Sequence, residues 1–438
     1  MQDRHAVRHR TVADALGALF SVRIGHFLMS QPFVLGVNYW PRRKAMYWWS
    51  DFDAGEVREE FALMQELGLN VVRLFLLWDD FQPSPDEVSA ECLKNFTTVC
   101  DLAAEAGLGL DVTFFTGHMS GPNWSPRWLL DAGLPIPSKY VRQVVSRDGI
   151  FNGGYRNMYT DPAALEAERL LVRTVVEAFK DHPAVWMWNL GNEPDLFAWP
   201  PDAVYGRAWV RGMVGLIREL DPKHPITYGL HVASLHEDNG FRVDHVYAET
   251  DVAVMHSYPM YLPWARSPLD PEVVPFTCAL TSALCGKPTL MEEFGGCTNA
   301  PGKPSEVWEW TAYDQPRTQF MASEEDLAAY LVEVLPRLVD VGAAGALVWC
   351  FADYIPELWD KPPCKESKHE RFFGLVRPDG SLKPHAQVIK DFAAGRPVVK
   401  EAVRRVEMDI SPDEYYHAPL AHLARFFEQY LAAESAPS

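Results

Sequence analysis

Short apolar runs alternate with longer amphipathic stretches along most of the chain. Eight such runs are expected to form buried strands, and they cover residues 33–39, 70–78, 108–117, 184–193, 226–232, 251–259, 288–296 and 345–353. Most of them are followed by a stretch whose apolar residues recur at the helical period. These predicted helices cover residues 55–68, 89–107, 161–182, 205–220, 271–286, 324–342 and 385–395, and only a short, weakly helical stretch follows the fifth run. Strands that alternate with helices of this length indicate parallel βαβ connections.

Eight strand–helix units predict an α/β fold of the (β/α)8 TIM-barrel type, with its active site at the C-terminal ends of the strands. A doubly wound sheet is the alternative, but the chain has no glycine fingerprint for a nucleotide. Long loops follow the third strand (residues 117–160) and the seventh strand (residues 295–322). Because long loops in compact domains are usually functional, we expect both to wall an active-site cleft.

The barrel is expected to occupy residues 29–397. Residues 1–28 form an N-terminal extension with a basic character and a short apolar stretch that Arg23 interrupts. We interpret this extension either as a targeting segment or as sequence upstream of a natural start at Met29. Residues 398–438 add roughly one helix, which we expect to pack on the barrel or on a partner. The oligomeric state is left open.

Composition and charge narrow the function classes. The formal charge of −19 and the lack of a basic stripe argue against a nucleic-acid partner. No apolar run approaches the roughly 20 residues that span a bilayer, so no membrane partner is expected. The seven cysteines show no metal-binding spacing, and their odd, scattered set favours reduced thiols in the cytoplasm. We therefore expect a cytoplasmic protein without metal or cofactor, and its 15 tryptophans suit packing against sugar rings.

Two segments carry the main chemical signal. WMWNLGNEPD and PTLMEEFGG are both apolar runs that end in glutamate, and they place Glu193 and Glu293 at the tips of the fourth and seventh strands. Pro194 blocks continuation into a helix and so holds the first carboxyl group at the rim. Two carboxylates presented this way are what cleavage of a glycosidic bond with retained stereochemistry requires.

The alternation of side chains decides which glutamate of the seventh strand is functional. Thr289, Met291 and Glu293 share one face, which we predict to be the barrel interior, whereas Glu292 would face the helical shell. The alternative is that Glu292 is the functional residue and Glu293 its solvated neighbour.

The motifs NLGNEP and LMEEFG resemble the acid/base and nucleophile motifs of clan A glycoside hydrolases, and most of all those of family 5. The resemblance runs from about Phe33 to Ala394. Further positions match side chains that surround the family's catalytic pair: Arg73 in VVRLF beside the nucleophile, Asn192 at the sugar 2-hydroxyl, His256 and Tyr258 in HSYP near the nucleophile, and Trp349 in LVWCF as the platform under the sugar. His118 and Trp124 in GHMSGPNW follow the third strand and are further candidates for sugar binding.

The resemblance implies a double displacement with two carboxyl groups about 5–5.5 Å apart. Glu193 would start protonated as the acid/base, and Glu293 would start ionised as the nucleophile. A buried Arg73 requires a carboxylate partner, for which Glu293 is the natural candidate. Arg73 and Tyr258 would favour the charged form of Glu293, and the negative neighbour would raise the pKa of Glu193.

Within family 5 the closest resemblance is to the β-mannan-degrading members, the β-mannosidases and β-mannanases. It rests on residues 158–195, 250–264 and 288–296 and implies a β-linked mannoside or gluco/manno-oligosaccharide as substrate. Residues 36–53 form a basic, tryptophan-rich loop that does not align with endo-acting members, so we expect this loop to block one end of the cleft and favour exo action. The alternatives are a β-glucosidase, an endo-glucanase or an endo-β-mannanase of the same fold, and more remotely a transglycosidase or a non-catalytic sugar-binding barrel.

Overall fold

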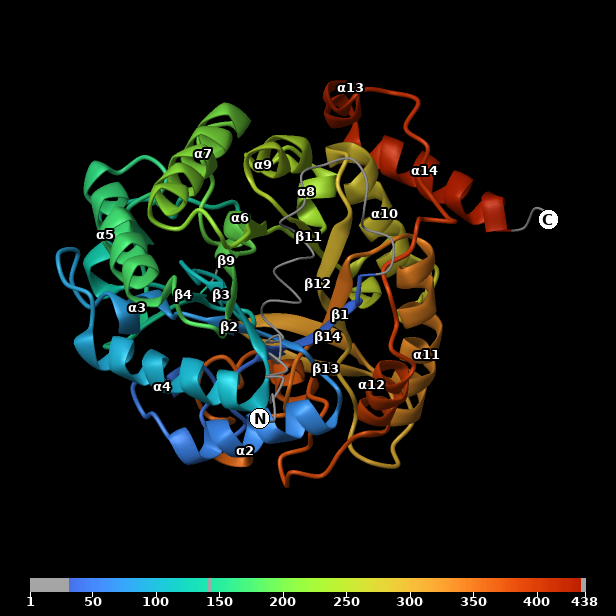
Figure 1. Ribbon diagram of the computed structural model, residues 1–438, viewed down its shortest axis with the longest axis horizontal. Helices are drawn as coiled ribbons and strands as arrows, with labels where there is room; N and C mark the ends of the chain where they lie inside the picture. Colours follow the sequence, from blue (N-terminus) through green and yellow to red (C-terminus); the bar gives the residue numbers. More distant parts are fainter. Residues whose placement is uncertain (1–30, 141–142, 435–438) are drawn as a thin grey trace, which may run out of the picture.

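The computed structural model describes residues 31–140 and 143–434, so the predicted extension 1–28 lies outside the described residues. Its centre is a parallel eight-stranded barrel (Figure 1). In chain order the strands are β1 (Val34–Tyr39), β2 (Val71–Phe75), β3 (Gly109–Thr113), β9 (Val185–Asn192), β10 (Ile226–Gly229), β11 (Ala253–His256), β12 (Thr289–Gly295) and β15 (Gly345–Trp349). The sheet order β10-β9-β3-β2-β1-β15-β12-β11 leaves β10 and β11 at its ends. The backbone N–H of His256 donates to the carbonyl oxygen of Leu230 (3.0 Å), which closes the ring. The predicted (β/α)8 fold is confirmed.

Helices surround the barrel as the periodicity predicts (Figure 1). They are α2 (Ala54–Glu66), α4 (Ala90–Ala106), α5 (Pro162–Phe179), α7 (Ala203–Leu220), α9 (Val243–Glu249), α10 (Val273–Cys285), α11 (Glu324–Asp340) and α12 (Pro384–Ala394). The weakly helical stretch after the fifth strand is the seven-residue α9. Five of these helices begin at a side chain that accepts backbone N–H bonds of the first turn: Asp53, Ser89, Asp161, Asp202 and Ser323.

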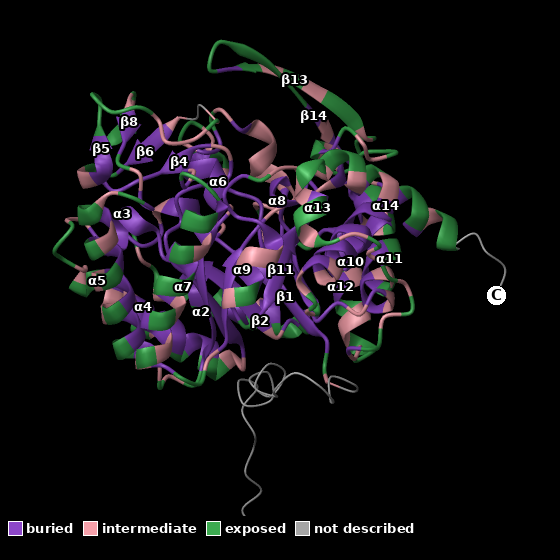
Figure 2. Ribbon diagram, turned by 90° about the horizontal axis from the view of Figure 1, so that it is seen from above, coloured by how far each residue is buried: buried purple, intermediate pink, exposed green. Residues whose placement is uncertain are grey.

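Both long loops carry structure of their own. The loop after β3 contains the short strands β4 (Asn123–Trp124), β5 (Leu130–Asp131), β6 (Val144–Ser146), β7 (Gly149–Phe151) and β8 (Gly154–Tyr155). The loop after β12 contains a hairpin of β13 (Glu306–Ala312) and β14 (Gln315–Met321), which projects from the barrel in Figure 2. The Tyr313 hydroxyl at the hairpin turn donates to Gln143 Oε1 (3.4 Å), so the two loops meet.

The last two helices, α13 (Pro412–His417) and α14 (Pro419–Glu434), lie against the short helix α8 (Ala233–His236) and α10. The Tyr415 hydroxyl donates to the carbonyl oxygen of Leu235 (2.7 Å). The rings of Phe427 and Phe276 are 4.9 Å apart. No described helix combines the length and the apolar composition that crossing a bilayer requires.

Candidate active site

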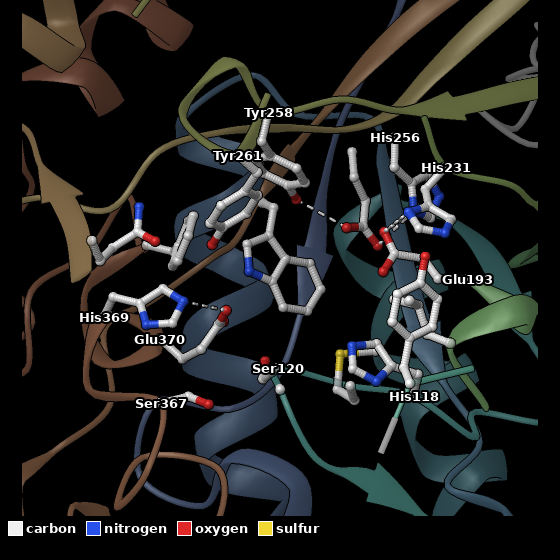
Figure 3. Close-up of a pocket in the computed structure, with 18 of the residues that line it drawn as sticks. His118, Ser120, Glu193, His231, His256, Tyr258, Tyr261, Ser367, His369 and Glu370 are labelled. Carbon is white, nitrogen blue, oxygen red and sulfur yellow. Dashed lines mark hydrogen bonds and ion pairs between the residues drawn. The ribbon is translucent and has the colours of Figure 1, made fainter. Parts of the chain in front are cut away.

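A cavity of about 590 Å³ opens at the C-terminal ends of the strands, a size typical of small-ligand sites (Figure 3). Its walls come from the loop after β3 (His118 to Gly121), the β13–β14 hairpin (Trp310 to Gln319) and the loop after β15 (Glu366 to Phe373). The predicted role of the loops after the third and seventh strands as walls is confirmed.

The loop at residues 36–53 does not line this cavity, so the prediction that it blocks one end is wrong. Its tryptophans are core residues instead. Trp48 and Trp49 are fully buried, and the Trp49 indole N–H donates to the carbonyl oxygen of Phe75 (2.8 Å). The β13–β14 hairpin and the loop after β15 enclose the cavity instead.

Glu193 stands directly after β9 in the left-handed backbone region (φ 45°, ψ 61°), which residues with a side chain seldom adopt. Pro194 begins the one-turn helix α6 (Pro194–Phe197), so the prediction that it blocks continuation into a helix is wrong, although the strand does end before it and Glu193 lies at the rim. Glu193 Oε1 lies 3.1 Å from His256 Nδ1 and 4.0 Å from His231 Nδ1. Strained backbone at a residue that faces a cavity is typical of functional sites.

Glu293 is the centre of a second set of contacts. Arg73 is fully buried, and its Nη1 donates to Glu293 Oε1 (2.6 Å). The Tyr258 hydroxyl donates to Glu293 Oε2 (2.9 Å). The structure thus brings the predicted arginine, tyrosine and glutamate together, with both carboxylate oxygens of Glu293 held by donors.

The predicted position of Glu292 is wrong. Its carboxylate does not face the helical shell but lies inside the barrel, 3.3 Å from Arg73 Nη2 and 2.9 Å from His256 Nε2. Thr289 was predicted to face the barrel interior, but it points outward, since its hydroxyl forms a hydrogen bond with the hydroxyl of Ser282 on α10. The pairing of β12 with both neighbouring strands shifts register after Met291, and such an irregularity places successive side chains on the same side. Glu292 is fully buried beneath Glu293, which is 4% exposed and lines the cavity.

Glu193 and Glu293 come close together at the rim. One carboxylate oxygen of each and one ring nitrogen of His256 all lie within 4.8 Å of one another. Carboxylate oxygens this close fit the short spacing of about 5–5.5 Å between the carboxyl groups that is expected of a retaining glycosidase. The same trio has a spacing that a cation could occupy, but the Arg73 guanidinium already supplies a positive charge to Glu293. A second acid–histidine group, Asp244, His245 and Asp413, lies outside the cavity.

The pKa shifts differ from the predicted pattern. Burial acts to raise the pKa of Glu193, but the charge of His231 and the hydrogen bond to His256 outweigh it, so this pKa lies below its ordinary value. Burial raises the pKa of Glu293, although His256 and Arg73 act against it. The prediction of a raised pKa at Glu193 is therefore wrong, because the sequence pattern placed no histidine charge beside Glu193. Arg73 and Tyr258 favour the charged form of Glu293 as predicted, but burial outweighs them in the direction of its pKa shift. Burial lowers the pKa of His256, but the Glu293 charge and hydrogen bonds to carboxylates raise it to about 9.

Three further predicted residues line the cavity. Trp349 ends β15 and is 5% exposed. The Asn192 amide accepts a hydrogen bond from Arg73 Nη2 (3.0 Å) and donates to the carbonyl oxygen of His118 (3.0 Å). His118 Nδ1 lies 2.9 Å from the side-chain oxygen of Asn123. Asn192 thus links the arginine to the loop after β3.

Trp124 is not part of the cavity lining, so its prediction as a sugar-binding residue is wrong. It lies in β4 and is 4% exposed. Its indole N–H donates to the carbonyl oxygen of Met119 (3.1 Å), and its ring packs edge-on against Tyr47 (5.8 Å). Trp124 therefore supports the loop that carries His118.

Three cavity residues, and one buried partner of theirs, had not been predicted. His231 follows β10, and its Nε2 lies 2.7 Å from Oδ1 of the buried Asp195. Glu370 and His369 belong to a short 3-10 helix in the loop after β15 (Lys368–Phe372). Asp195 stands in the NEPD motif, which was a usable signal, whereas the other three lie in segments without a recognisable pattern.

A barrel with two rim carboxylates, one of them bound to a buried arginine, defines the class of TIM-barrel glycosidases. The family model for "Glycosyl hydrolases family 2, TIM barrel domain" matches residues 139–395, more than half of the chain. The chain belongs to this family. A model described as "Beta-galactosidase" matches residues 46–200.

Relatives connect the chain to β-mannan degradation. Mannan endo-1,4-beta-mannosidase 4 of Oryza sativa subsp. japonica is 26% identical over 55% of this chain, and the match spans only 56% of the rice protein. The exo-beta-1,4-mannosidase Op5Man5 from Opitutaceae bacterium strain TAV5 is 26% identical, with a TM-score of 0.68 and coverage of 84% of this chain and 60% of that chain. The predicted resemblance to β-mannan-degrading clan A enzymes is confirmed.

A second structure covers almost the whole of both chains. It is a GH5_18 variant from Streptomyces cattleya in complex with Manb1-4GlcNAc, 22% identical, with a TM-score of 0.72 and 93% coverage of each chain. At this identity the likeness supports the shared fold of the two barrels.

Proposed function

We propose that this protein is a retaining glycoside hydrolase that removes terminal β-mannosyl residues by double displacement. The observation that carries the proposal is the pair of Glu193 and Glu293 at the tips of β9 and β12, with carboxylate oxygens within 4.8 Å of one another. Similarity to mannan endo-1,4-beta-mannosidases and to an exo-beta-1,4-mannosidase supports β-mannosides as the substrate class.

Glu293 acts as the nucleophile. Its carboxylate attacks the anomeric carbon, the bond to the leaving oxygen breaks, and a glycosyl-enzyme forms. Arg73 and Tyr258 hold the attacking carboxylate in one orientation through the 2.6 Å and 2.9 Å hydrogen bonds. Trp349 offers the sugar a flat apolar surface, and Asn192 stands beside the pair at the position expected for the 2-hydroxyl.

Glu193 acts as the acid and then as the base, and His256 stores its proton. With its pKa raised to about 9, the His256 ring is charged at neutral pH, and Nδ1 lies 3.1 Å from Glu193 Oε1. As the bond to the anomeric carbon forms, Glu293 loses its negative charge, the strongest influence favouring the charged ring. In the same step the His256 proton moves to Glu193, and Glu193 passes a proton to the oxygen whose bond to the sugar breaks. In the second half Glu193 takes a proton from water, the water oxygen displaces Glu293, and the proton returns to His256.

Exo action is favoured by the enclosed shape of the cavity. The hairpin and the loop after β3 meet at Tyr313 and Gln143. The loop after β15 joins the hairpin, where the Trp310 indole N–H donates to the carbonyl oxygen of Glu366 (2.8 Å). An endo-acting enzyme requires an open cleft that admits sugar units on both sides of the scissile bond. For the compartment, all seven cysteines are free thiols, which supports a reducing environment such as the cytoplasm.

Product analysis with β-mannohexaose, beside nitrophenyl β-mannoside and nitrophenyl β-glucoside, tests the proposal. Release of single mannose units together with cleavage of the nitrophenyl mannoside is expected. A mixture of shorter oligosaccharides would identify an endo-β-mannanase instead. Turnover of the glucoside alone would keep the catalytic pair and reject the mannoside assignment.

A further inference from the structure

Besides the catalytic pair, Glu366 and Glu370 line the cavity, and the proposed mechanism uses neither of them. Glu370 lines the cavity from the loop after β15, and its side chain is 11% exposed. Figure 3 shows Glu370 and His369 on one side of the cavity and Glu193 with His231 and His256 on the other. A ligand between the two sides would have one end at the catalytic pair and the other end at Glu370.

The surroundings of Glu370 leave its carboxyl group without a full countercharge. Among the described residues, the side-chain nitrogen within ion-pair range is His369 Nε2, 3.4 Å from Glu370 Oε1. Burial lowers the pKa of His369 to about 4, so this ring is neutral at neutral pH. A buried carboxyl group with a neutral partner is costly to maintain unless another group satisfies it. His369 Nδ1 is also buried and has no hydrogen-bond partner among the described residues.

Glu370 lines the same cavity as the predicted sugar platform Trp349 and as Ser120 of the loop after β3. Burial raises the pKa of Glu370 to about 8, while the nearby polar groups of Ser120 and Trp349 act to lower it. A sugar stacked on Trp349 would therefore lie in the same cavity as this carboxyl group. The charge of Glu293 raises the same pKa, so both carboxyl groups act within one enclosed space.

We propose that Glu370, together with His369, binds two neighbouring hydroxyl groups of the terminal sugar on the side of the ring away from its anomeric carbon. This inference rests on the proposed function, because it assumes that a sugar stacks on Trp349 with its anomeric carbon at Glu293. A carboxyl group has two oxygens that accept hydrogen bonds from adjacent hydroxyls. The ligand class is a non-reducing terminal pyranoside with free 3- and 4-hydroxyl groups.

The same contact explains why only a terminal unit would fit. A sugar inside a β-1,4-linked chain carries a further sugar on its 4-oxygen, and that oxygen has no proton to donate to Glu370. The carboxyl group would then be buried against an ether oxygen and a bulky substituent. Glu370 would thus select terminal sugar units in two ways: it contacts their free hydroxyl groups favourably and internal sugar units unfavourably.

Deoxy substrates combined with Glu370 variants test this assignment. The rates kcat/KM are measured for nitrophenyl β-mannoside and its 3-deoxy and 4-deoxy analogues, with the wild type, Glu370→Gln and Glu370→Ala. We expect the wild type to lose about 10- to 100-fold on at least one deoxy analogue, the range for leaving a buried polar group without its hydrogen-bond partner. In Glu370→Ala the parent substrate should lose a similar factor, and the deoxy analogue should lose little more than a few-fold further.

Controls separate recognition from folding. Glu357→Gln changes an exposed glutamate earlier in the same loop and should keep wild-type rates. Thermal melting should show Glu370→Gln folded, since the two side chains have nearly the same shape. The assignment would be overturned if kcat/KM fell by the same factor from the parent mannoside to the deoxy analogue in the wild type and in Glu370→Ala. It would also be overturned if Glu370→Gln kept the wild-type kcat/KM on the parent mannoside.

The outcome is separable from failure of the proposed function. If the wild type cleaves a glucoside instead of the mannoside, the same comparison with deoxyglucosides tests Glu370 while the mannoside assignment fails. If it cleaves neither, calorimetric titration with mannose and 4-deoxymannose provides the test. Weaker binding of 4-deoxymannose to the wild type, and equal binding of both sugars to Glu370→Ala, would support the inference, and equal binding to the wild type would reject it.

Discussion

Replacement of Tyr258 by phenylalanine isolates one contact of the proposed nucleophile. The Tyr258 hydroxyl donates to Glu293 Oε2 at 2.9 Å, and the ring itself packs against Tyr261 and Phe373. Burial, and then the charge of Glu293, raise the pKa of Tyr258 well above its ordinary value, so the hydroxyl stays protonated as a donor. Tyr258→Phe removes this donor and keeps the ring.

The magnitude follows from the type of bond. A hydrogen bond to a charged group contributes about 1.5–3 kcal/mol. Since about 1.4 kcal/mol corresponds to a factor of ten, kcat/KM should fall by about 10- to 100-fold. The donor stabilises the ionised form of Glu293, so its loss raises the Glu293 pKa. The nucleophile then stays protonated up to a higher pH, and the acidic limb of the pH profile should move upward by roughly one to two units.

The assay is kcat/KM for an aryl β-mannoside across the pH range, with Tyr330→Phe as the matched control. Tyr330 on α11 has a buried hydroxyl without a hydrogen-bond partner in the described part of the chain, so its loss should leave both rate and profile unchanged. Wild-type kcat/KM and an unshifted acidic limb in Tyr258→Phe would refute the reasoning. An equal fall in both variants would assign the effect to general destabilisation.

Three further outcomes concern the stability of the fold. Arg73→Met should lower the free energy of unfolding in urea by about 3–5 kcal/mol, because it leaves buried carboxylates without their countercharge, and an unchanged midpoint would contradict this. Burial raises the pKa of Glu60 to about 8, so its ionisation opposes folding as pH rises from its unfolded value towards 8. Between pH 5 and pH 8 the Tm should therefore fall less for Glu60→Gln than for the wild type. Equal falls in Tm would contradict this role of Glu60. Trp124→Phe loses the bond to Met119 and should lower Tm with KM nearly unchanged, whereas a raised KM at unchanged Tm would restore Trp124 to sugar binding.

The barrel could be predicted because its signals are local and repeated. Each strand is an apolar run long enough to be buried on both faces, and most of the runs are followed by a capped amphipathic helix. The same logic placed Glu193 at the end of β9 with Pro194 behind it. Arg73 could be assigned to a carboxylate because a buried guanidinium requires one.

The predictions failed where the position of a side chain depends on tertiary contacts. The sequence along β12 could not reveal that Thr289 points to α10 and Glu292 into the barrel beside Arg73, or that a register shift brings Glu293 to the same side. Trp124 follows the third strand as a sugar-binding residue could, but its indole N–H is used within its own loop. Glu370 reaches the cavity from an irregular loop about 20 residues beyond β15, and no periodicity marks such a position.

Covalent labelling of the nucleophile tests the central claim most directly. A 2-deoxy-2-fluoro-β-mannosyl fluoride should form a long-lived glycosyl-enzyme, because the fluorine at C2 slows the second step more than the first. Peptide mass spectrometry should then find the sugar on Glu293, and NMR of the initial hydrolysis product of an aryl β-mannoside should show the β-anomer. A label on Glu292, or an α-anomer without any label, would contradict the account.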